Sequence, residues 1–201
     1  MSEPLALFNG LPCRLLMDTC IIDKLFENGS YIWEGELPDG VTEETVDPEL
    51  RALREILEVN QRASFQWLVS PLSVAELANV QDFADRERRV RWILDLLDHW
   101  LILLDEIGDR VSRGGTVRHR FKFSVELQRL EADLMSIADF RRDPFDRLLL
   151  VQYRMGNCDA FLTTDHDTIW RHRDELSDLG IVVLRPTEYW DRLKPWAALW
   201  V

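Results

Sequence analysis

Four acidic side chains stand at matching places in a repeated pattern of apolar runs and helices, and they are the residues best suited to chemistry. Each one directly follows a strand-like apolar run or lies on the helix that comes next. They are Asp18 in RLLMDTC, Glu76 in SPLSVAEL, Asp146 in DPFDRLLL and Asp165 in LTTDHD. Because the carboxyl ends of parallel strands share one edge of a sheet, where α/β folds bind ligands, we predict that these carboxylates converge.

Carboxylates that converge raise one another's pKa unless a counter-charge joins them. A divalent cation removes this cost, and a ligand set of hard oxygen atoms favours Mg²⁺ or Mn²⁺. Such a cation also lowers the pKa of bound water and polarises a phosphoryl oxygen. The pattern therefore predicts a divalent metal site that hydrolyses phosphate esters.

Each acid also has a structural explanation when it is considered alone. Asp is favoured at the N-cap of a helix, which accounts for Asp18. Ser73 and Glu76 match a capping box, in which the Glu side chain reaches back to the N-cap amide. A helix that starts at Ser70 and Pro71 instead places Glu76 in its second turn.

The other two acids have similar alternatives. Asp146 stands in the first turn of an apolar helix, where the helix dipole favours an acid, and Asp143 lies one turn earlier. Asp165 or Asp167 suits the N-cap position in a turn from strand to helix. The four acids indicate a shared site because all of them recur at the same kind of place.

Strand-like apolar runs alternate with helical patterns along the chain. Strands are predicted at 13–17, 64–70, 101–106, 159–164 and 181–186. Helices are predicted at 19–29, 48–63, 71–84, 86–100, 123–140, 144–157, 167–179 and 187–196, and loops at 30–47 and 108–120. Since the strands are continuous apolar runs, the pattern favours an α/β fold with a mostly parallel sheet of about five strands, covered on both faces.

Length and composition set the class of protein. The 201 residues suffice for a single domain spanning 1–201. No window approaches the roughly 18 consecutive apolar residues of a membrane span, and the N-terminus lacks the pattern of a secretory signal. The three cysteines have no paired spacing, so reduced thiols and a cytoplasmic location are expected.

The charge of the chain has two opposing features. A net charge of −12 argues against a general nucleic-acid binder. Of the 24 basic residues, however, only three are Lys, and Arg pairs well with phosphates. We expect Arg118 and Arg120, in a Gly/Arg stretch with almost no acid, and Arg147 to contact substrate. The structural alternative is that these Arg side chains pair with the many acidic residues.

The acidic motifs carry a family resemblance. LLMDTCIIDKL, LVSPLSVAEL, DPFDRLLLVQ and DAFLTTDHDTI, in this order and followed by IVVLRPTEYW, resemble the PIN domain family. The resemblance covers about residues 13–190, and DPFDRLLLVQ is similar to the toxin ribonucleases of VapBC-type toxin–antitoxin pairs. It implies a three-layer α/β/α sandwich, metal-dependent endoribonuclease activity on RNA, and an inhibitory antitoxin protein as a partner.

The resemblance also implies roles for individual residues. The implied catalytic set consists of Asp18, Glu76, Asp146 and Asp165. The three Asp of this set are the implied ligands of Mg²⁺ or Mn²⁺. Thr163 matches the common hydroxyl residue of the family, and Asp143 and Asp167 match auxiliary acids.

The chain departs from the family pattern in its length. Extra residues stand near 28–63 and 105–135, and the first of these segments contains an acidic loop. These insertions keep open a binding or scaffold module without catalysis, and the carboxylates alone also suit a metal-dependent phosphatase or DNA nuclease. Apolar surface around Trp190, Trp196 and Trp200 suits a partner or a homodimer.

Overall fold

The structure of the protein is a computed structural model that describes residues 10–60, 65–79, 81–97, 101–102 and 125–197. Within these residues, the strands pair in the order β3-β2-β1-β4-β5, and each pairing is parallel. The strands are β1 (Arg14–Met17), β2 (Gln66–Val69), β3 (Leu101–Ile102), β4 (Ala160–Leu162) and β5 (Val183–Leu184). The predicted α/β class and parallel sheet are therefore confirmed, although the two outer strands are only 2 residues long.

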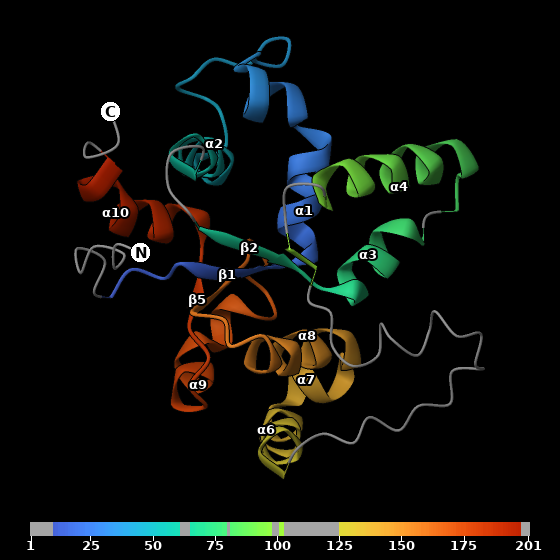
Figure 1. The fold of residues 1–201 in the computed structure, drawn as a ribbon, viewed down its shortest axis with the longest axis vertical. Helices are drawn as coiled ribbons and strands as arrows, with labels where there is room; N and C mark the ends of the chain where they lie inside the picture. Colours follow the sequence, from blue (N-terminus) through green and yellow to red (C-terminus); the bar gives the residue numbers. More distant parts are fainter. Residues whose placement is uncertain (1–9, 61–64, 80, 98–100, 103–124, 198–201) are drawn as a thin grey trace, which may run out of the picture.

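Helices connect the strands and cover the sheet. The first group comprises α1 (Thr19–Glu27), the π-helix η2 (Ser30–Glu34), α2 (Pro48–Asn60), α3 (Pro71–Ala78) and α4 (Phe83–Leu97). The second group comprises α6 (Val125–Ser136), α7 (Ala138–Arg142), α8 (Pro144–Met155), the 3₁₀-helix η3 (Trp170–His172), α9 (Arg173–Asp178) and α10 (Pro186–Ala197). Figure 1 shows α1, α2 and α10 on one side of the sheet and α6 to α9 on the other.

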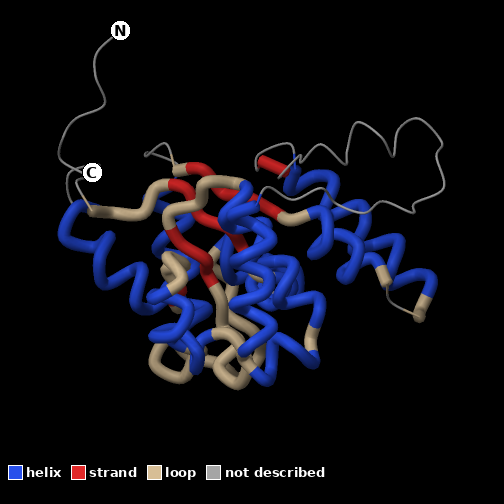
Figure 2. The backbone as a smooth tube through the Cα atoms, turned by 90° about the horizontal axis from the view of Figure 1, so that it is seen from below, coloured by secondary structure: helices blue, strands red, loops and turns tan. Residues whose placement is uncertain are grey.

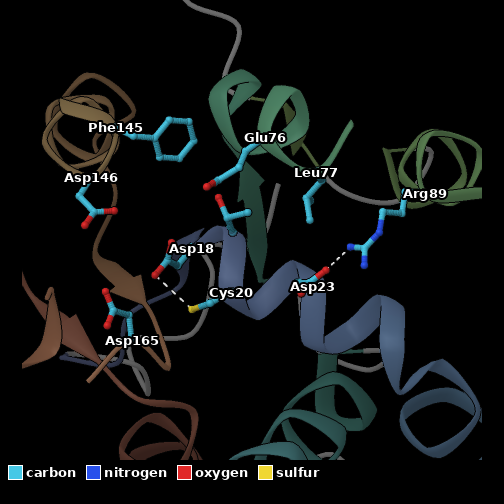
Figure 3. Close-up of a pocket in the computed structure, with 10 residues that line it drawn as sticks. Asp18, Cys20, Asp23, Glu76, Leu77, Arg89, Phe145, Asp146 and Asp165 are labelled. Atoms are coloured by element: carbon cyan, nitrogen blue, oxygen red, sulfur yellow. Dashed lines mark hydrogen bonds and ion pairs between the residues drawn. The ribbon is translucent and has the colours of Figure 1, made fainter. Parts of the chain in front are cut away.

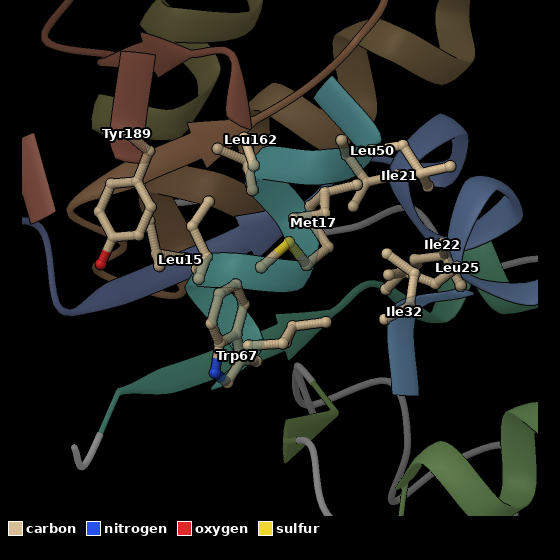
Figure 4. Packing of buried hydrophobic residues seen from close by; sticks show 14 of the residues in the cluster. Leu15, Met17, Ile21, Ile22, Leu25, Ile32, Leu50, Trp67, Leu162 and Tyr189 are labelled. Atoms are coloured by element: carbon tan, nitrogen blue, oxygen red, sulfur yellow. The ribbon is translucent and has the colours of Figure 1, made fainter. Parts of the chain in front are cut away.

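Alternate residues of each strand face opposite sides of the sheet, so two separate cores form. Leu15 and Met17 of β1 pack with residues of α1, α2 and α10, as Figure 4 shows. Leu16, between them, belongs to the other core, together with residues of α6, α8 and α9. The sheet is thus the middle of three layers, with helices on both of its sides (Figure 2).

Several predicted segments differ from the structure. The helix predicted at 167–179 consists of a turn, η3 and α9, and the helix predicted at 71–84 ends with α3 at Ala78. The stretch 30–47, predicted as a loop, begins with the π-helix η2, because Tyr31 and Ile32 are apolar enough to be buried in the core. The single helix predicted at 123–140 is divided into α6 and α7. The division lies at Ile137, whose backbone is extended, and it allows Phe140 to reach the core with no exposed surface.

Parts of the sequence prediction lie outside the described residues. They include residues 103–106 of the predicted third strand, the predicted loop at 108–120 and most of the insertion near 105–135. In the part of the chain that the structure describes, no helix has the length and apolar character that crossing a membrane requires.

Candidate acidic active site

The four predicted acids line one open pocket at the carboxyl edge of the sheet. Its volume is about 420 Å³. The lining residues are Asp18, Thr19, Cys20, Asp23, Glu76, Leu77, Arg89, Phe145, Asp146 and Asp165. Figure 3 shows the carboxylates of Asp18, Glu76, Asp146 and Asp165 around a common space, although they come from four different segments of the chain. The predicted convergence of these side chains is therefore observed.

Asp18 follows β1 and is 5% exposed. It stands at the N-cap of α1, but its side chain makes no capping hydrogen bond. Its Oδ2 atom instead accepts hydrogen bonds from Thr163 Oγ1 at 2.5 Å and from Cys20 Sγ at 3.2 Å. Burial, which outweighs these hydrogen bonds, raises the pKa of Asp18 to about 6. Capping therefore does not explain this acid.

Cys20 is a pocket residue that the sequence analysis did not single out. It lies two residues after Asp18, and its Sγ atom accepts hydrogen bonds from the backbone N–H and the hydroxyl of Thr164, both at 3.3 Å. Burial and the charge of Asp18 raise the pKa of the Cys20 thiol to about 12. Cys20 is therefore a neutral thiol that donates to Asp18.

Asp165 is held by a hydrogen-bonded turn after β4. Its backbone N–H donates to Thr163 Oγ1 at 2.8 Å. Its Oδ1 atom accepts from the backbone N–H groups of Asp167 at 2.9 Å and Thr168 at 3.1 Å. One carboxylate oxygen thus shapes the turn, and the side chain still faces the pocket (Figure 3).

Asp143 and Asp146 have different roles at the start of α8. Asp143 is the N-cap, and its Oδ1 atom accepts from the backbone N–H groups of Phe145 at 2.8 Å and Asp146 at 3.2 Å. The side chain of Asp146 is consequently not needed as a cap and faces the pocket (Figure 3). Burial, followed by the charges of Asp143, Asp18, Asp165 and Glu76, raises the pKa of Asp146 to about 7.

Glu76 reaches the pocket from α3 and is exposed at its rim. Ser70 is the N-cap of α3, because its Oγ atom accepts from the backbone N–H of Leu72 at 2.9 Å. The helix therefore begins at Pro71, and Glu76 lies in its second turn, as the alternative start predicted. A capping box formed with Ser73 does not account for Glu76, since Ser73 lies inside the helix.

The four carboxylates have no cationic side chain as a partner among the described residues. Arg89 lines the same pocket, but its guanidinium group pairs with Asp23 and Asp85 and lies 3.7 Å from Glu27. Its ion pair with Asp23 is visible in Figure 3. The sequence did not place Arg89 at this pocket, because its position depends on how α4 packs beside α1.

The donor atoms of the pocket suit a hard divalent cation. They are carboxylate oxygens, together with the hydroxyl of Thr19, which is buried and has no hydrogen-bond partner within the described part of the chain. No group of three or more His, Cys, Asp or Glu among the described residues is arranged to hold a metal ion. The carboxylates thus share a pocket whose chemistry fits a cation, without forming a closed coordination shell.

The remaining predicted residues lie in less favourable places. Asp167 has a fully exposed side chain beside the pocket-lining Asp165. Arg147, expected to contact substrate, is 13% exposed and lies near Glu131, and it donates to the backbone oxygen of Phe140 at 2.7 Å. This geometry does not support a contact of Arg147 with substrate. Arg118 and Arg120 lie outside the described residues.

Comparison of the chain with protein-family models, curated proteins and solved structures found no match. The interpretation of the site consequently depends on its own geometry and on the order of its motifs.

Proposed function

We propose that this protein is a metal-dependent endoribonuclease of the PIN type. The observation that carries the proposal is the shared pocket of Asp18, Glu76, Asp146 and Asp165, which no described cationic side chain neutralises. Burial, followed by the negative charges of the neighbouring carboxylates, raises the pKa of Asp146 to about 7. A site that concentrates uncompensated carboxylates is well explained by a bound divalent cation.

Asp18, Asp146 and Asp165 are the proposed ligands of Mg²⁺ or Mn²⁺. When bound, the cation supplies a site that polarises a phosphoryl oxygen and acidifies water. The protein would hydrolyse the phosphodiester so that the 3′ oxygen leaves and the product carries a 5′-phosphate.

The side chains of the protein prepare this site in distinct ways. Thr163 orients Asp18 through its hydroxyl and anchors the backbone of Asp165 through the same oxygen. Asp143 fixes the start of α8, so that Asp146 is free to face the pocket. Glu76, exposed at the rim, is available to orient the attacking water or to accept its proton.

The PIN assignment has two supports. The order of the acidic motifs resembles that family, and the parallel sheet between two helical layers is compatible with the α/β/α sandwich it implies. RNA as the substrate, an antitoxin partner and a homodimer are expectations from the resemblance and from the apolar C-terminal residues.

A cleavage assay tests the proposal. Purified protein would be incubated with end-labelled single-stranded RNA in Mn²⁺ and in EDTA, beside the variants Asp18→Asn and Asp146→Asn. The control is Asp191→Asn, since Asp191 is exposed on α10 and pairs with Lys194. We expect cleavage by the wild type and the control in Mn²⁺ alone, and only background cleavage by the two pocket variants. Equal activity in all samples would refute the proposal.

The same conditions with other substrates, together with a measurement of Mn²⁺ binding, separate the other functions. Cleavage of single-stranded DNA, or release of phosphate from a monoester, in place of RNA cleavage would favour a DNA nuclease or a phosphatase. Absence of every activity together with absence of Mn²⁺ binding would favour a scaffold module.

A further inference from the structure

His166, the residue after the pocket-lining Asp165, forms an aromatic stack with Trp170. Their ring centroids are 4.6 Å apart, and the two planes are inclined by 29°. The guanidinium carbon of Arg173 lies 4.1 Å from the centroid of the Trp170 ring, and that of Arg185 lies 5.5 Å from it. Imidazole, indole and guanidinium groups are the side chains on which nucleobases stack in proteins that bind single strands.

The stack is held in a fixed relation to the pocket. The backbone N–H of Trp170 donates to the backbone oxygen of Asp165 at 3.0 Å, which closes the turn that also contains His166. The indole N–H of Trp170 donates to Glu188 Oε2 at 3.2 Å, and Arg173 donates to Glu188 Oε1 at 3.0 Å. The turn that presents Asp165 to the pocket therefore also presents the stack.

One face of the stack remains available to a ligand. The side chain of His166 is 62% exposed, although one of its faces lies against Trp170. Trp170 itself is half-buried and packs against the core that contains Ile169 and Leu176. Contact with Trp170 already restricts the rotation of the His166 ring. A base that stacks on its exposed face would therefore cost little side-chain entropy.

We propose that the exposed face of His166 is a nucleobase subsite of the ribonuclease proposed above. A base of single-stranded RNA stacks on His166 while the adjacent phosphate lies over the acidic pocket. His166 directly follows Asp165 in the turn that the Trp170 N–H closes, so a base on His166 and a phosphate over Asp165 would belong to neighbouring parts of one nucleotide strand. The proposal depends on the proposed function for its substrate class, and it adds the part of the substrate that this face recognises.

Stacking can bind RNA even though the net charge of the protein is −12. Asp165 and Asp167 flank His166 in the chain, and Asp167 Oδ1 lies 4.0 Å from His166 Nδ1. Negative charge therefore disfavours a phosphate contact at this ring, whereas Arg173 and Arg185 lie against Trp170. A nucleobase is neutral, so its stacking energy does not depend on the sign of the surrounding charge. The subsite would accept any base, because each base has a π-face, and it would favour single strands, whose bases are free to unstack.

The direct test is fluorescence of a short single-stranded RNA that carries 2-aminopurine, whose emission falls when the base stacks. The RNA would be titrated in Ca²⁺, which binds carboxylate oxygens but acidifies bound water less than Mn²⁺ does, so that the pocket charge is neutralised while cleavage stays slow. The proteins compared are the wild type and the variants His166→Ala and His166→Phe. The matched control is Ser177→Ala, since Ser177 is exposed on α9. We expect quenching by the wild type, the control and the Phe variant. We expect RNA binding by the Ala variant to be weaker by about 5- to 100-fold, with little quenching.

Salt supplies a second readout. The ratio of the RNA affinities of the wild type and the Ala variant should be the same at about 50 mM and 200 mM salt, because stacking releases no counterions. Equal emission from the wild type and the Ala variant, whether quenched or not, would overturn the subsite. A difference in RNA affinity between the two proteins that disappears at the higher salt concentration would also overturn the subsite.

These outcomes are separate from those of the cleavage assay. A protein that cleaves RNA in Mn²⁺ but fails the fluorescence test retains the proposed function and loses the subsite. A protein that shows His166-dependent quenching but never cleaves RNA retains a base-binding face and loses the proposed nuclease activity.

Discussion

Thr163 donates its hydroxyl proton to Oδ2 of Asp18 across a distance of 2.5 Å, and the same hydroxyl oxygen accepts the backbone N–H of Asp165 at 2.8 Å. Thr163 has no exposed surface. One buried hydroxyl thus joins the carboxyl ends of β1 and β4 and positions two of the acids in the pocket.

Replacement of Thr163 by Val should therefore destabilise the protein, because it leaves the Asp18 carboxylate and the Asp165 amide without this partner. We expect a loss of about 1–3 kcal/mol in the free energy of unfolding, measured by urea denaturation. Thr163→Ser keeps the hydroxyl and should recover most of the hydrogen-bond contribution. A Val variant as stable as the wild type would show that the contact contributes nothing.

The metal-free protein should lose stability from Asp146 as the pH rises. An unfolded Asp ionises near pH 4, whereas the pKa of Asp146 in the folded protein is about 7. Between these values the folded state binds the extra proton, so this contribution to stability is greatest at low pH and decreases up to about pH 7. Thermal unfolding in EDTA should show that Asp146→Asn raises the Tm at pH 8 and has little effect at pH 4. An Asn variant that is less stable at pH 8 would contradict this account.

Mn²⁺ should bind more tightly as the pH increases, because the cation competes with the protons on Asp18 and Asp146, whose pKa values are about 6 and about 7. Calorimetric titrations at pH 6 in two buffers of different ionisation enthalpy would measure the protons released. We expect net release at pH 6 and almost none at pH 8.5. Binding without proton release at pH 6 would place the ion away from these two carboxyl groups.

Arg89 should be the basic residue that fixes α4 beside α1. Its side chain is 15% exposed and pairs with Asp23 of α1 and Asp85 of α4. Arg89→Met should lower the free energy of unfolding by about 1.5–3 kcal/mol, since it leaves charged partners unpaired. Arg91→Met is the matched control, because Arg91 is 75% exposed and pairs with the exposed Glu87, and it should change stability by less than about 0.5 kcal/mol. Equal effects of the two substitutions would remove the special role of Arg89.

The sequence predicted the pocket acids well because their places follow from simple rules. Apolar runs mark strands, parallel strands end at a common edge, and Asp18 and Asp165 directly follow two such runs. The sequence could not decide between capping and chemistry at Glu76, because that choice depends on whether Ser70 or Ser73 caps α3. The hydrogen bond from the Leu72 N–H to Ser70 Oγ shows that Ser70 is the cap, which removes the capping explanation, and a chemical role of Glu76 stays a prediction.

Features that depend on tertiary packing could not be predicted from the sequence. The local sequence pattern does not predict that the helix is interrupted at Ile137. It also does not predict that Tyr31 and Ile32 are buried in a π-helix. The stack of His166 on Trp170 likewise depends on the turn that Asp165 shapes, although the aromatic rings are four residues apart. Sequence reasoning located the acids in this region but missed the stack that lies beside them.

The central claim is that the pocket carboxylates jointly bind one or more divalent cations, and a crystal structure with Mn²⁺ tests it most directly. Anomalous scattering locates manganese independently of any interpretation of the surrounding side chains. The account predicts an anomalous peak within coordination distance of Asp18, Asp146 and Asp165, and loss of that peak in Asp146→Asn. A pocket without a peak at millimolar Mn²⁺, or a peak held only by residues elsewhere, would contradict it.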